Sequence, residues 1–243
     1  MQHSLKRIIQ RVLASRGYQI SRLNPNQSLD ASDSLMLFLR ANYKFTTIID
    51  IGANDGAFIQ FLQSFFHSPR SIAFEPLPAA RRQMENRNIP GITIFPHALS
   101  DRSGMASFDV NAYAPASSLL PVSALSATQF PQTSQLVEKI KVPMERLDDL
   151  IDADTLEPAV FLKMDVQGVE DRVIAGGKRV ISKADIIMIE VSFRAMYDGQ
   201  ALFEEVHTPL AAMGFRLAGI KNQISAANGE PLFGHFVYRK ANA

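Results

Sequence analysis

Two carboxylates and a glycine turn stand where α/β proteins bind an adenosine-containing cofactor. Asp50 lies near the end of the apolar, β-branched segment 47–51, and Gly52 and Gly56 bracket the turn that follows. Such a segment predicts a buried strand of a parallel sheet, and ligands bind beyond the carboxyl ends of these strands. Glu75 ends the next apolar segment, where a carboxylate can accept both hydroxyls of a ribose. The pattern therefore predicts a cofactor that carries adenosine.

The spacing of the turn separates the candidate cofactors. A dinucleotide-binding turn needs G-x-G-x-x-G, because its second glycine lets a pyrophosphate reach the backbone and the helix N-terminus. Here Asn54 occupies the second-glycine position, and Asp50 precedes the turn. A carboxylate repels phosphate and attracts a cation, and S-adenosylmethionine has a sulfonium and no phosphate. The turn favours S-adenosylmethionine over NAD, with a glycine-rich turn that binds no ligand as the alternative.

A second NAD-binding pattern is missing from the sequence. Short-chain dehydrogenases need a tyrosine with a lysine four residues later, and none of the five tyrosines has one. A nucleotide-dependent oxidoreductase therefore stays only as an alternative.

A second pair of acidic residues lies at the same predicted sheet edge. Asp165 ends the apolar segment 159–165, and Glu190 lies near the end of 185–191. A hydroxyl nucleophile benefits from a base or a metal, so Asp165 is the first candidate for a catalytic base and Glu190 the second. The two could also hold a divalent ion if a third ligand approached, or be structural acids, so the metal stays unknown. Lys163 shares a strand face with Asp165, which leaves an ion pair or a catalytic role open.

The order of the predicted elements indicates a doubly wound α/β sheet. Strands alternate with helices, which favours right-handed crossovers in a mostly parallel sheet. The connector before the last strand contains Asn228 and Gly229 and lacks a helical pattern, so this strand is predicted to be antiparallel. We expect a Rossmann-like three-layer sandwich with a mostly parallel seven-stranded sheet and an antiparallel C-terminal hairpin strand. The strands are predicted at 47–52, 71–75, 92–96, 159–165, 185–191, 215–220 and 233–239, and the helices at 57–66, 78–87, 169–181 and 201–213.

Residues 112–133 break this alternation. The segment is rich in Ser, Ala and Pro, and it follows a possible small extra strand at 104–111. A long irregular segment inside a compact domain is usually a functional lid or an excursion of the chain. A substrate lid and a simple surface insertion both fit the sequence.

The N-terminal region differs from the rest, and we predict a helical cap at 1–45 on a single catalytic domain at 46–243. Residues 1–23 contain five basic residues and no acidic one. Their apolar residues follow helical spacing, with the basic residues on the other face. A helix that caps the domain and a helix that makes weak membrane-surface contact both fit this pattern.

Composition limits the partners and the compartment. A net charge of +1 gives no general attraction to nucleic acid, and the absence of cysteine excludes disulfides and thiolate metal sites. The chain has neither an apolar segment of about eighteen residues nor the apolar core of a signal peptide. We therefore expect a cytoplasmic protein without a nucleic-acid partner.

Seven segments give the chain a resemblance to the FkbM family of S-adenosylmethionine-dependent methyltransferases. FLKMDVQGVE after RLDDL is the most specific signal, whereas IDIGANDG occurs in many methyltransferases. Gln167 and Asp55 depart mildly from the family pattern. In family order the matching segments are IIDIGANDGAF, IAFEPLP, HALSDRSGMASF, SSLLP, VPMERLDDLI, FLKMDVQGVEDRVIAGG and IIMIEVSF.

The resemblance implies the class I methyltransferase fold and a role for each site residue. It implies that Glu75 holds the ribose and that Asp165 faces the transferring methyl group. His97, Ala98 and Leu99 would flank the adenine. The residues that it places around the methionine part of the cofactor are Asp50, Gly52, Asn54 and Gly56.

The resemblance also implies methyl transfer to a hydroxyl oxygen. We expect a small-molecule acceptor, either a sugar or glycan or a secondary metabolite, with S-adenosyl-L-methionine as the methyl donor. A module that binds the cofactor without turnover is the second alternative, beside the oxidoreductase. His207 and His235 lie late in the chain, where a base role and a packing role are both open.

Overall fold

The computed structural model describes residues 31–66 and 70–241 of the chain. The basic helix expected within residues 1–23 lies outside them, so its membrane contact stays a prediction, as does the division of the chain after residue 45. Within the described part of the chain, no helix is long and apolar enough to cross a membrane.

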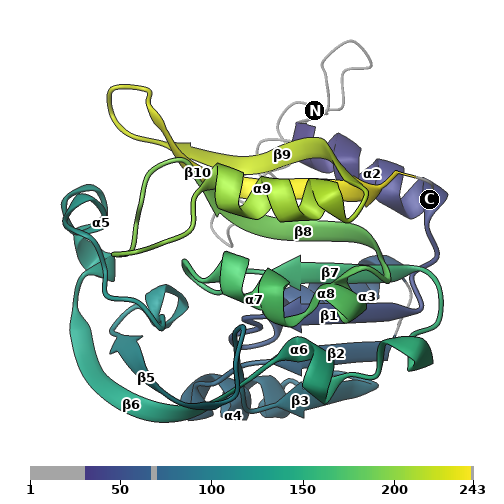
Figure 1. The fold of residues 1–243 in the computed structure, drawn as a ribbon, viewed down its shortest axis with the longest axis horizontal. Helices are drawn as coiled ribbons and strands as arrows, with labels where there is room; N and C mark the ends of the chain where they lie inside the picture. Colours follow the sequence, from purple (N-terminus) through teal and green to yellow (C-terminus); the bar gives the residue numbers. More distant parts are fainter. Residues whose placement is uncertain (1–30, 67–69, 242–243) are drawn as a thin grey trace, which may run out of the picture.

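A seven-stranded sheet forms the middle layer, with strand order β3-β2-β1-β7-β8-β10-β9 (Figure 1). The strands from β3 to β8 are parallel to their neighbours, and β10 is antiparallel to both β8 and β9. This arrangement confirms the predicted fold class. The strands are β1 (Thr47–Ile51), β2 (Arg70–Phe74), β3 (Ile92–Phe95), β7 (Val160–Met164), β8 (Ala184–Ser192), β9 (Phe215–Ser225) and β10 (Pro231–Lys240).

Helices cover both faces of this sheet and complete the three layers. Successive strand residues point to opposite faces, and Ile48 and Ile49 accordingly belong to different apolar clusters. Ile49 packs in the cluster that α6 to α9 contribute to, and Ile48 in the cluster with α2 and α3. The helices are α2 (Ala31–Asn42), α3 (Ala57–Phe66), α4 (Pro78–Asn86), α6 (Leu147–Leu150), η3 (Ala153–Thr155), α7 (Glu170–Gly176), α8 (Lys178–Ile181) and α9 (Phe203–Ala212).

Two short helices, α7 and α8, replace the single helix predicted over 169–181, so that prediction is wrong. The break falls at Gly177. The chain passes very close to its neighbour here, because a Cβ on Gly176 would lie 2.0 Å from the carbonyl oxygen of Ser100. The two successive glycines allow both this close approach and the break.

A second sheet of three strands, in the order β4-β6-β5, contains two strands that the sequence analysis missed. β5 confirms the extra strand expected at 104–111, whereas β4 and β6 were not predicted. β6 had a signal, since Ile140, Val142 and Met144 alternate with polar residues and proline. The strands of this sheet are β4 (Ala98–Leu99), β5 (Gly104–Asn111) and β6 (Leu136–Glu145).

Residues 112–133, here called the strap, connect β5 to β6. The strap is fixed to the segment after β8, because the Ser123 amide donates to the Met196 carbonyl and the Asp198 amide donates to the Pro121 carbonyl, both at 2.9 Å. The irregular segment is therefore an anchored part of the domain. Its short helices are η1 (Ala114–Ala116), α5 (Ala124–Gln129) and η2 (Pro131–Thr133).

Candidate active site

Two adjoining cavities open at the carboxyl ends of the central parallel strands. The first is a narrow slot with about 60 Å³ of free space, and the second is wider, with about 670 Å³. They meet at a shared wall, and the strap contributes to both. The residues that line both cavities are Gly52, Asn54, Pro115, Asp165 and Gln167.

The turn after β1 is shaped by its close approach to β7. Gly52 has φ +80°, and a Cβ there would lie 2.0 Å from the carbonyl oxygen of Asp165. Only glycine combines this backbone conformation with this approach. Asn54 also has a positive φ of +46°, and its amide donates to the Glu75 carboxylate at 2.8 Å. The turn and the end of β2 are thus joined at the wall of the slot.

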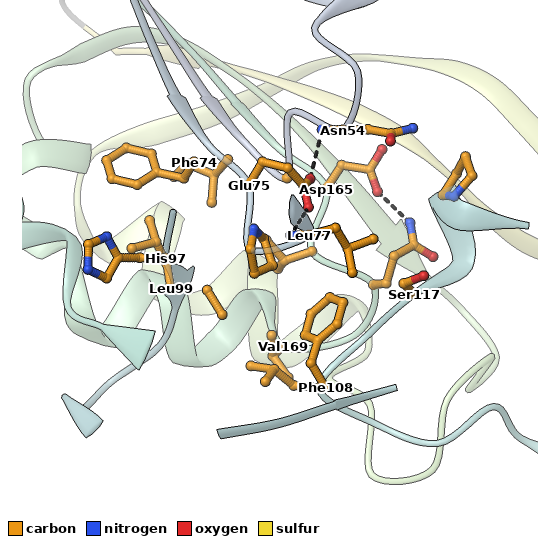
Figure 2. A pocket seen from close by; sticks show the side chains of 18 of the residues that line it. Asn54, Phe74, Glu75, Leu77, His97, Leu99, Phe108, Ser117, Asp165 and Val169 are labelled. Carbon is orange, nitrogen blue, oxygen red and sulfur yellow. Dashed lines mark hydrogen bonds between the residues drawn. The ribbon is translucent and has the colours of Figure 1, made fainter. Parts of the chain in front are cut away.

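Glu75 is a buried carboxylate that directly follows the last residue of β2. Its two oxygens accept from the amides of Asn54, at 2.8 Å, and Leu77, at 2.7 Å (Figure 2). Each carboxylate oxygen keeps further acceptor capacity for a ligand hydroxyl. Burial raises the pKa of Glu75 to about 7, although the two amides and Arg81 favour the ionised form.

The rest of the slot is mostly apolar. Leu77, Leu99 and Phe108 lie around it with Val169, and His97 stands at one end (Figure 2). The Nδ1 atom of His97 is buried and has no hydrogen-bond partner among the described residues. A narrow apolar slot with a polar atom at its end suits a flat heterocycle such as adenine.

The structure brings six of the eight predicted cofactor residues to the slot. The other two, Asp50 and Gly56, line neither cavity. Asp50 is fully buried beneath the turn, and a Cβ on Gly56 would lie 2.6 Å from the Cγ of Met84. These two residues lie behind the wall. The residues at the slot are Gly52, Asn54, Glu75, His97, Ala98 and Leu99.

Lys163 forms the ion pairs that were one of its two expected roles. Its register partner on β1 is Asp50, and the Nζ–Oδ1 distance is 3.3 Å. The same Nζ lies 3.5 Å from Oδ2 of Asp165. Burial would lower the pKa of Lys163, but the charges of Asp50 and Asp165 outweigh burial and raise it. The ammonium is therefore a permanent charge at the wall of the wide cavity.

Asp165 lies at the meeting point of the two cavities. His235 on β10 reaches it from the other side, with its Nε2 3.8 Å from Oδ2. Burial would raise the pKa of Asp165, but Lys163 and His235 outweigh burial and hold it well below the usual range. Asp165 is thus an anion at neutral pH.

Glu190 joins Asp165 through the side chain of Gln167. The Gln167 amide nitrogen donates to one oxygen of each carboxylate. Burial, with the charges of Asp165 and Glu170, raises the pKa of Glu190 well above the usual range. The two predicted catalytic acids therefore lie side by side and differ in proton affinity.

The side chains that could bind a metal ion are present, but most of their ligand atoms already have partners. Oxygen and nitrogen atoms of Asp165, Glu190 and His235 lie within 4.8 Å of one another. However, one oxygen of each carboxylate accepts from Gln167, and the second oxygen of Asp165 lies beside the Lys163 ammonium. A divalent ion would have to displace these donors and tolerate a fixed positive charge at this distance. The residues present do not fit a resident metal well.

The sequence predicted the wide cavity only in part. Of its lining residues only Asp165 and Glu190 were predicted as catalytic, with Lys163 and His235 left open. His235 had a signal, since an antiparallel last strand beside β8 pairs it with Glu190. Seven further lining residues belong to the strap, which the sequence left open as a substrate lid. Other side chains, such as Phe58, Met196, Tyr197 and Phe233, come from elements far apart in sequence and have no shared motif.

Fold and site together define a class I methyltransferase. Asp50 lies near the end of β1 and a glycine turn follows it, Glu75 follows β2, and the last strand is antiparallel to its neighbours. Residues 50–217 match the model of the methyltransferase FkbM domain. The chain belongs to the FkbM methyltransferase family, whose cofactor is S-adenosylmethionine. This confirms the predicted family, enzyme class and cofactor, and it removes the oxidoreductase alternative.

A curated relative and two solved structures are similar to this chain. The 2-O-methyltransferase NoeI of Sinorhizobium fredii (strain NBRC 101917 / NGR234) is 34% identical over 163 residues, which span 63% of this chain and 66% of that protein, just under two thirds. Aeropyrum pernix fibrillarin with bound S-adenosyl-L-methionine aligns with a TM-score of 0.44 and 10% identity, over 85% of this chain and 74% of that one. A SAM-dependent methyltransferase from Aquifex aeolicus aligns with a TM-score of 0.41 and 12% identity, over 86% and 89%.

Proposed function

We propose that the protein transfers a methyl group from S-adenosylmethionine to a hydroxyl oxygen of a sugar or glycan. The observation that carries this proposal is the pair of adjoining cavities that share Asp165 as a wall. The similarity to a 2-O-methyltransferase supports an oxygen acceptor. The slot would hold the cofactor, and the wide cavity the acceptor.

The narrow slot fits the adenosyl end of the cofactor. Glu75 would accept the two ribose hydroxyls, and His97, Ala98 and Leu99 would flank the adenine. The methionine end would then pass Gly52 and Asn54 and reach the shared wall. Asp50 and Gly56 would act from behind this wall, by fixing Lys163 and the turn. When bound, S-adenosylmethionine supplies an activated methyl group on a sulfonium.

The wide cavity has the surfaces that a sugar needs. Aromatic rings of Phe58, Phe130 and Phe233 and of Tyr113 and Tyr197 line it, and Phe130 and Phe233 meet edge to face at 5.9 Å between centroids. A sugar has apolar C–H faces that pack on aromatic rings and hydroxyl edges that need polar partners. Polar partners are present in the carboxylates, the Lys163 ammonium and the side chains of α5 and η2.

The pair of carboxylates would remove the proton from the acceptor hydroxyl. Asp165 is anionic, so it can accept a hydrogen bond from the acceptor hydroxyl and orient the oxygen toward the methyl group. The proton leaves the hydroxyl as the new C–O bond forms and the methyl–sulfur bond breaks. Burial raises the pKa of Glu190 above that of Asp165, so Glu190 holds a proton more firmly and Asp165 is the member that would take the acceptor's proton.

A methyl-transfer assay tests this proposal. Purified protein is incubated with S-adenosylmethionine and a panel of free sugars, oligosaccharides and polyketide-like alcohols, and S-adenosylhomocysteine is measured with the acceptor mass. The expected result is S-adenosylhomocysteine formation with a mass gain of one CH₂ unit on a sugar, and its loss in Asp165→Asn. Cofactor binding without turnover on any acceptor would indicate a binding module instead. Methylation of the alcohols alone would replace the sugar by a secondary metabolite.

A further inference from the structure

Gln167 makes more contacts at the shared wall than any role in cofactor binding requires. Its amide nitrogen has two hydrogens and donates to Oδ1 of Asp165 and to Oε1 of Glu190, the latter at 3.3 Å. Two carboxylates at this separation repel each other, and a donor between them offsets that repulsion. A single side chain thus holds both acids.

Tyr197 holds the other end of the Gln167 amide. The Tyr197 hydroxyl donates to Oε1 of Gln167 at 2.6 Å and lies 3.2 Å from the carbonyl oxygen of Ala116 in the strap. Burial, followed by the charges of Glu190 and Asp165, raises the pKa of Tyr197, so this hydroxyl keeps its proton. A flipped amide would direct its oxygen at both carboxylates, which accept and do not donate when ionised, so the acids themselves disfavour that orientation.

The backbone of Gln167 is held in an unfavourable conformation. Its φ is +59°, in the left-handed region, and Gly168 follows with φ +110°. The strap also holds this residue, because the Ser118 hydroxyl donates to its carbonyl oxygen at 2.6 Å. A left-handed residue other than glycine costs free energy and persists where surrounding contacts require it. Glycine would relieve this cost but would lack the amide.

From these contacts we propose that Gln167 is a positioning residue that keeps Asp165 and Glu190 in one fixed arrangement as a single proton-accepting pair. The inference rests on the proposed function, since the pair is taken as the site that receives the acceptor proton. It adds to the two acids an amide partner from the segment between β7 and α7. Tyr197 supports Gln167 indirectly, because its hydroxyl donates to the amide oxygen of Gln167.

Other charged groups also face the pair, and the test has to separate them from Gln167. Lys163 on β7 and His235 on β10 approach Asp165, and Glu170 at the start of α7 acts on both acids. Tyr197 faces the pair from the segment after β8. All of these side chains remain in a Gln167 variant, and only Tyr197 loses a hydrogen-bond partner there. A change in the titration of the pair therefore reports on the amide together with its contact to Tyr197.

The test compares Gln167→Glu and Gln167→Gly with Asn222→Gly as the control. Asn222 has nearly the same φ, +47°, but is exposed on β9 and lines neither cavity. The titration of the two acids is followed by NMR of ¹³C-carboxyl-labelled protein without substrate, with assignments from Asp165→Asn and Glu190→Gln. Turnover and S-adenosylhomocysteine affinity are measured on the same samples.

We expect Gln167→Glu to move the titration of the pair to higher pH, because it replaces a donor by a third acid. We expect Gln167→Gly to fold normally and to lower kcat by about 100-fold, the loss expected for misplaced reacting groups. Cofactor affinity should change far less, and Asn222→Gly should match the wild type. An unchanged titration in both variants overturns the inference, even if the wild type shows no turnover on any acceptor. Full turnover in Gln167→Gly overturns it as well.

Discussion

The slot and the wide cavity share a wall but are assembled in different ways. The slot uses neighbouring parts of the chain, chiefly residues 51–54 after β1, 74–77 after β2 and 97–99. The wide cavity shares the turn at 52–55 and adds side chains from α3, the strap, β7, β8, β10 and the segments after β7 and β8. A cofactor site made mainly of turns at strand ends fixes one ligand in one orientation, whereas an acceptor site completed by the strap can change without disturbing the sheet. The proposed roles of the two cavities follow this division.

The largest expected effect comes from adding a methyl group at the shared wall. Gly52→Ala places a Cβ against the Asp165 carbonyl and a side chain at positive φ. We expect the free energy of unfolding to fall by about 4 kcal/mol, from the sum of backbone strain and overpacking. Gly229→Ala is the control, since φ is +86° there with no atom within 4 Å of its Cβ. Equal losses in urea unfolding of the two variants would contradict the close approach at Gly52.

Removing one charge at the meeting point should abolish most catalysis but keep the cofactor. Asp165→Asn retains the shape of the side chain and removes the anion that orients the acceptor. We expect kcat to fall by about 1000-fold, within the range for a general base, with a much smaller change in S-adenosylhomocysteine affinity. Isothermal titration and initial rates on the same preparation check this. Near-normal kcat would separate Asp165 from the chemistry.

A change at the slot should do the reverse and weaken cofactor binding. Glu75→Gln removes the charged acceptor proposed for the ribose, and we expect about tenfold to 100-fold weaker binding of S-adenosylhomocysteine at a pH above 7. The matched control is Glu85→Gln on the exposed side of α4. If the two variants bind equally well in isothermal titration, the ribose does not lie at Glu75.

The raised pKa of Glu75 predicts that cofactor binding in the slot depends on pH. Its pKa lies at about 7 in the fold, against a reference value of 4.5, because burial disfavours the ionised form. The carboxyl becomes protonated as pH falls through 7 and then loses one acceptor site, so cofactor affinity should fall in the same direction. Glu75→Gln should remove this dependence. An affinity that stays constant between pH 8 and pH 6, about one unit either side of the pKa, would contradict it.

The smallest effect is expected at the aromatic wall of the wide cavity. Phe130→Ala removes one apolar face for the acceptor, and we expect the KM for the sugar to rise by about five- to tenfold with the cofactor affinity unchanged. Phe61→Ala is the control, because Phe61 is 48% exposed on α3 and lines neither cavity. Steady-state kinetics with varied acceptor decide between them, and parallel behaviour of the two variants would count against Phe130 as an acceptor contact.

The parts of the molecule that could be predicted are those whose signal is local. The central strands and the slot follow from apolar segments that end in an acid or a glycine turn. β6 is harder to predict because its alternation is short, with adjacent apolar residues at Leu136 and Val137 and a proline at 143. The break at Gly177 accompanies the close approach of Gly176 to Ser100, which is distant in sequence and leaves no local pattern beyond the two glycines.

The acceptor side could be predicted only in part, because its contacts are non-local. Asp165 and Glu190 were found from their places at strand ends. Their joining through Gln167 depends on a left-handed backbone and on Tyr197, thirty residues away in sequence. No sequence periodicity predicts such a contact, because it depends on how the strap and the segment after β8 pack together in the folded protein.

A crystal structure of the protein with S-adenosylhomocysteine tests the central claim most directly. The account predicts the adenine in the slot beside Ala98 and Leu99, both ribose hydroxyls within hydrogen-bond distance of Glu75, and the sulfur directed at the shared wall near Asp165. The wide cavity should stay open for an acceptor. A cofactor bound in the wide cavity, with Glu75 away from the ribose, would contradict the assignment of the two cavities.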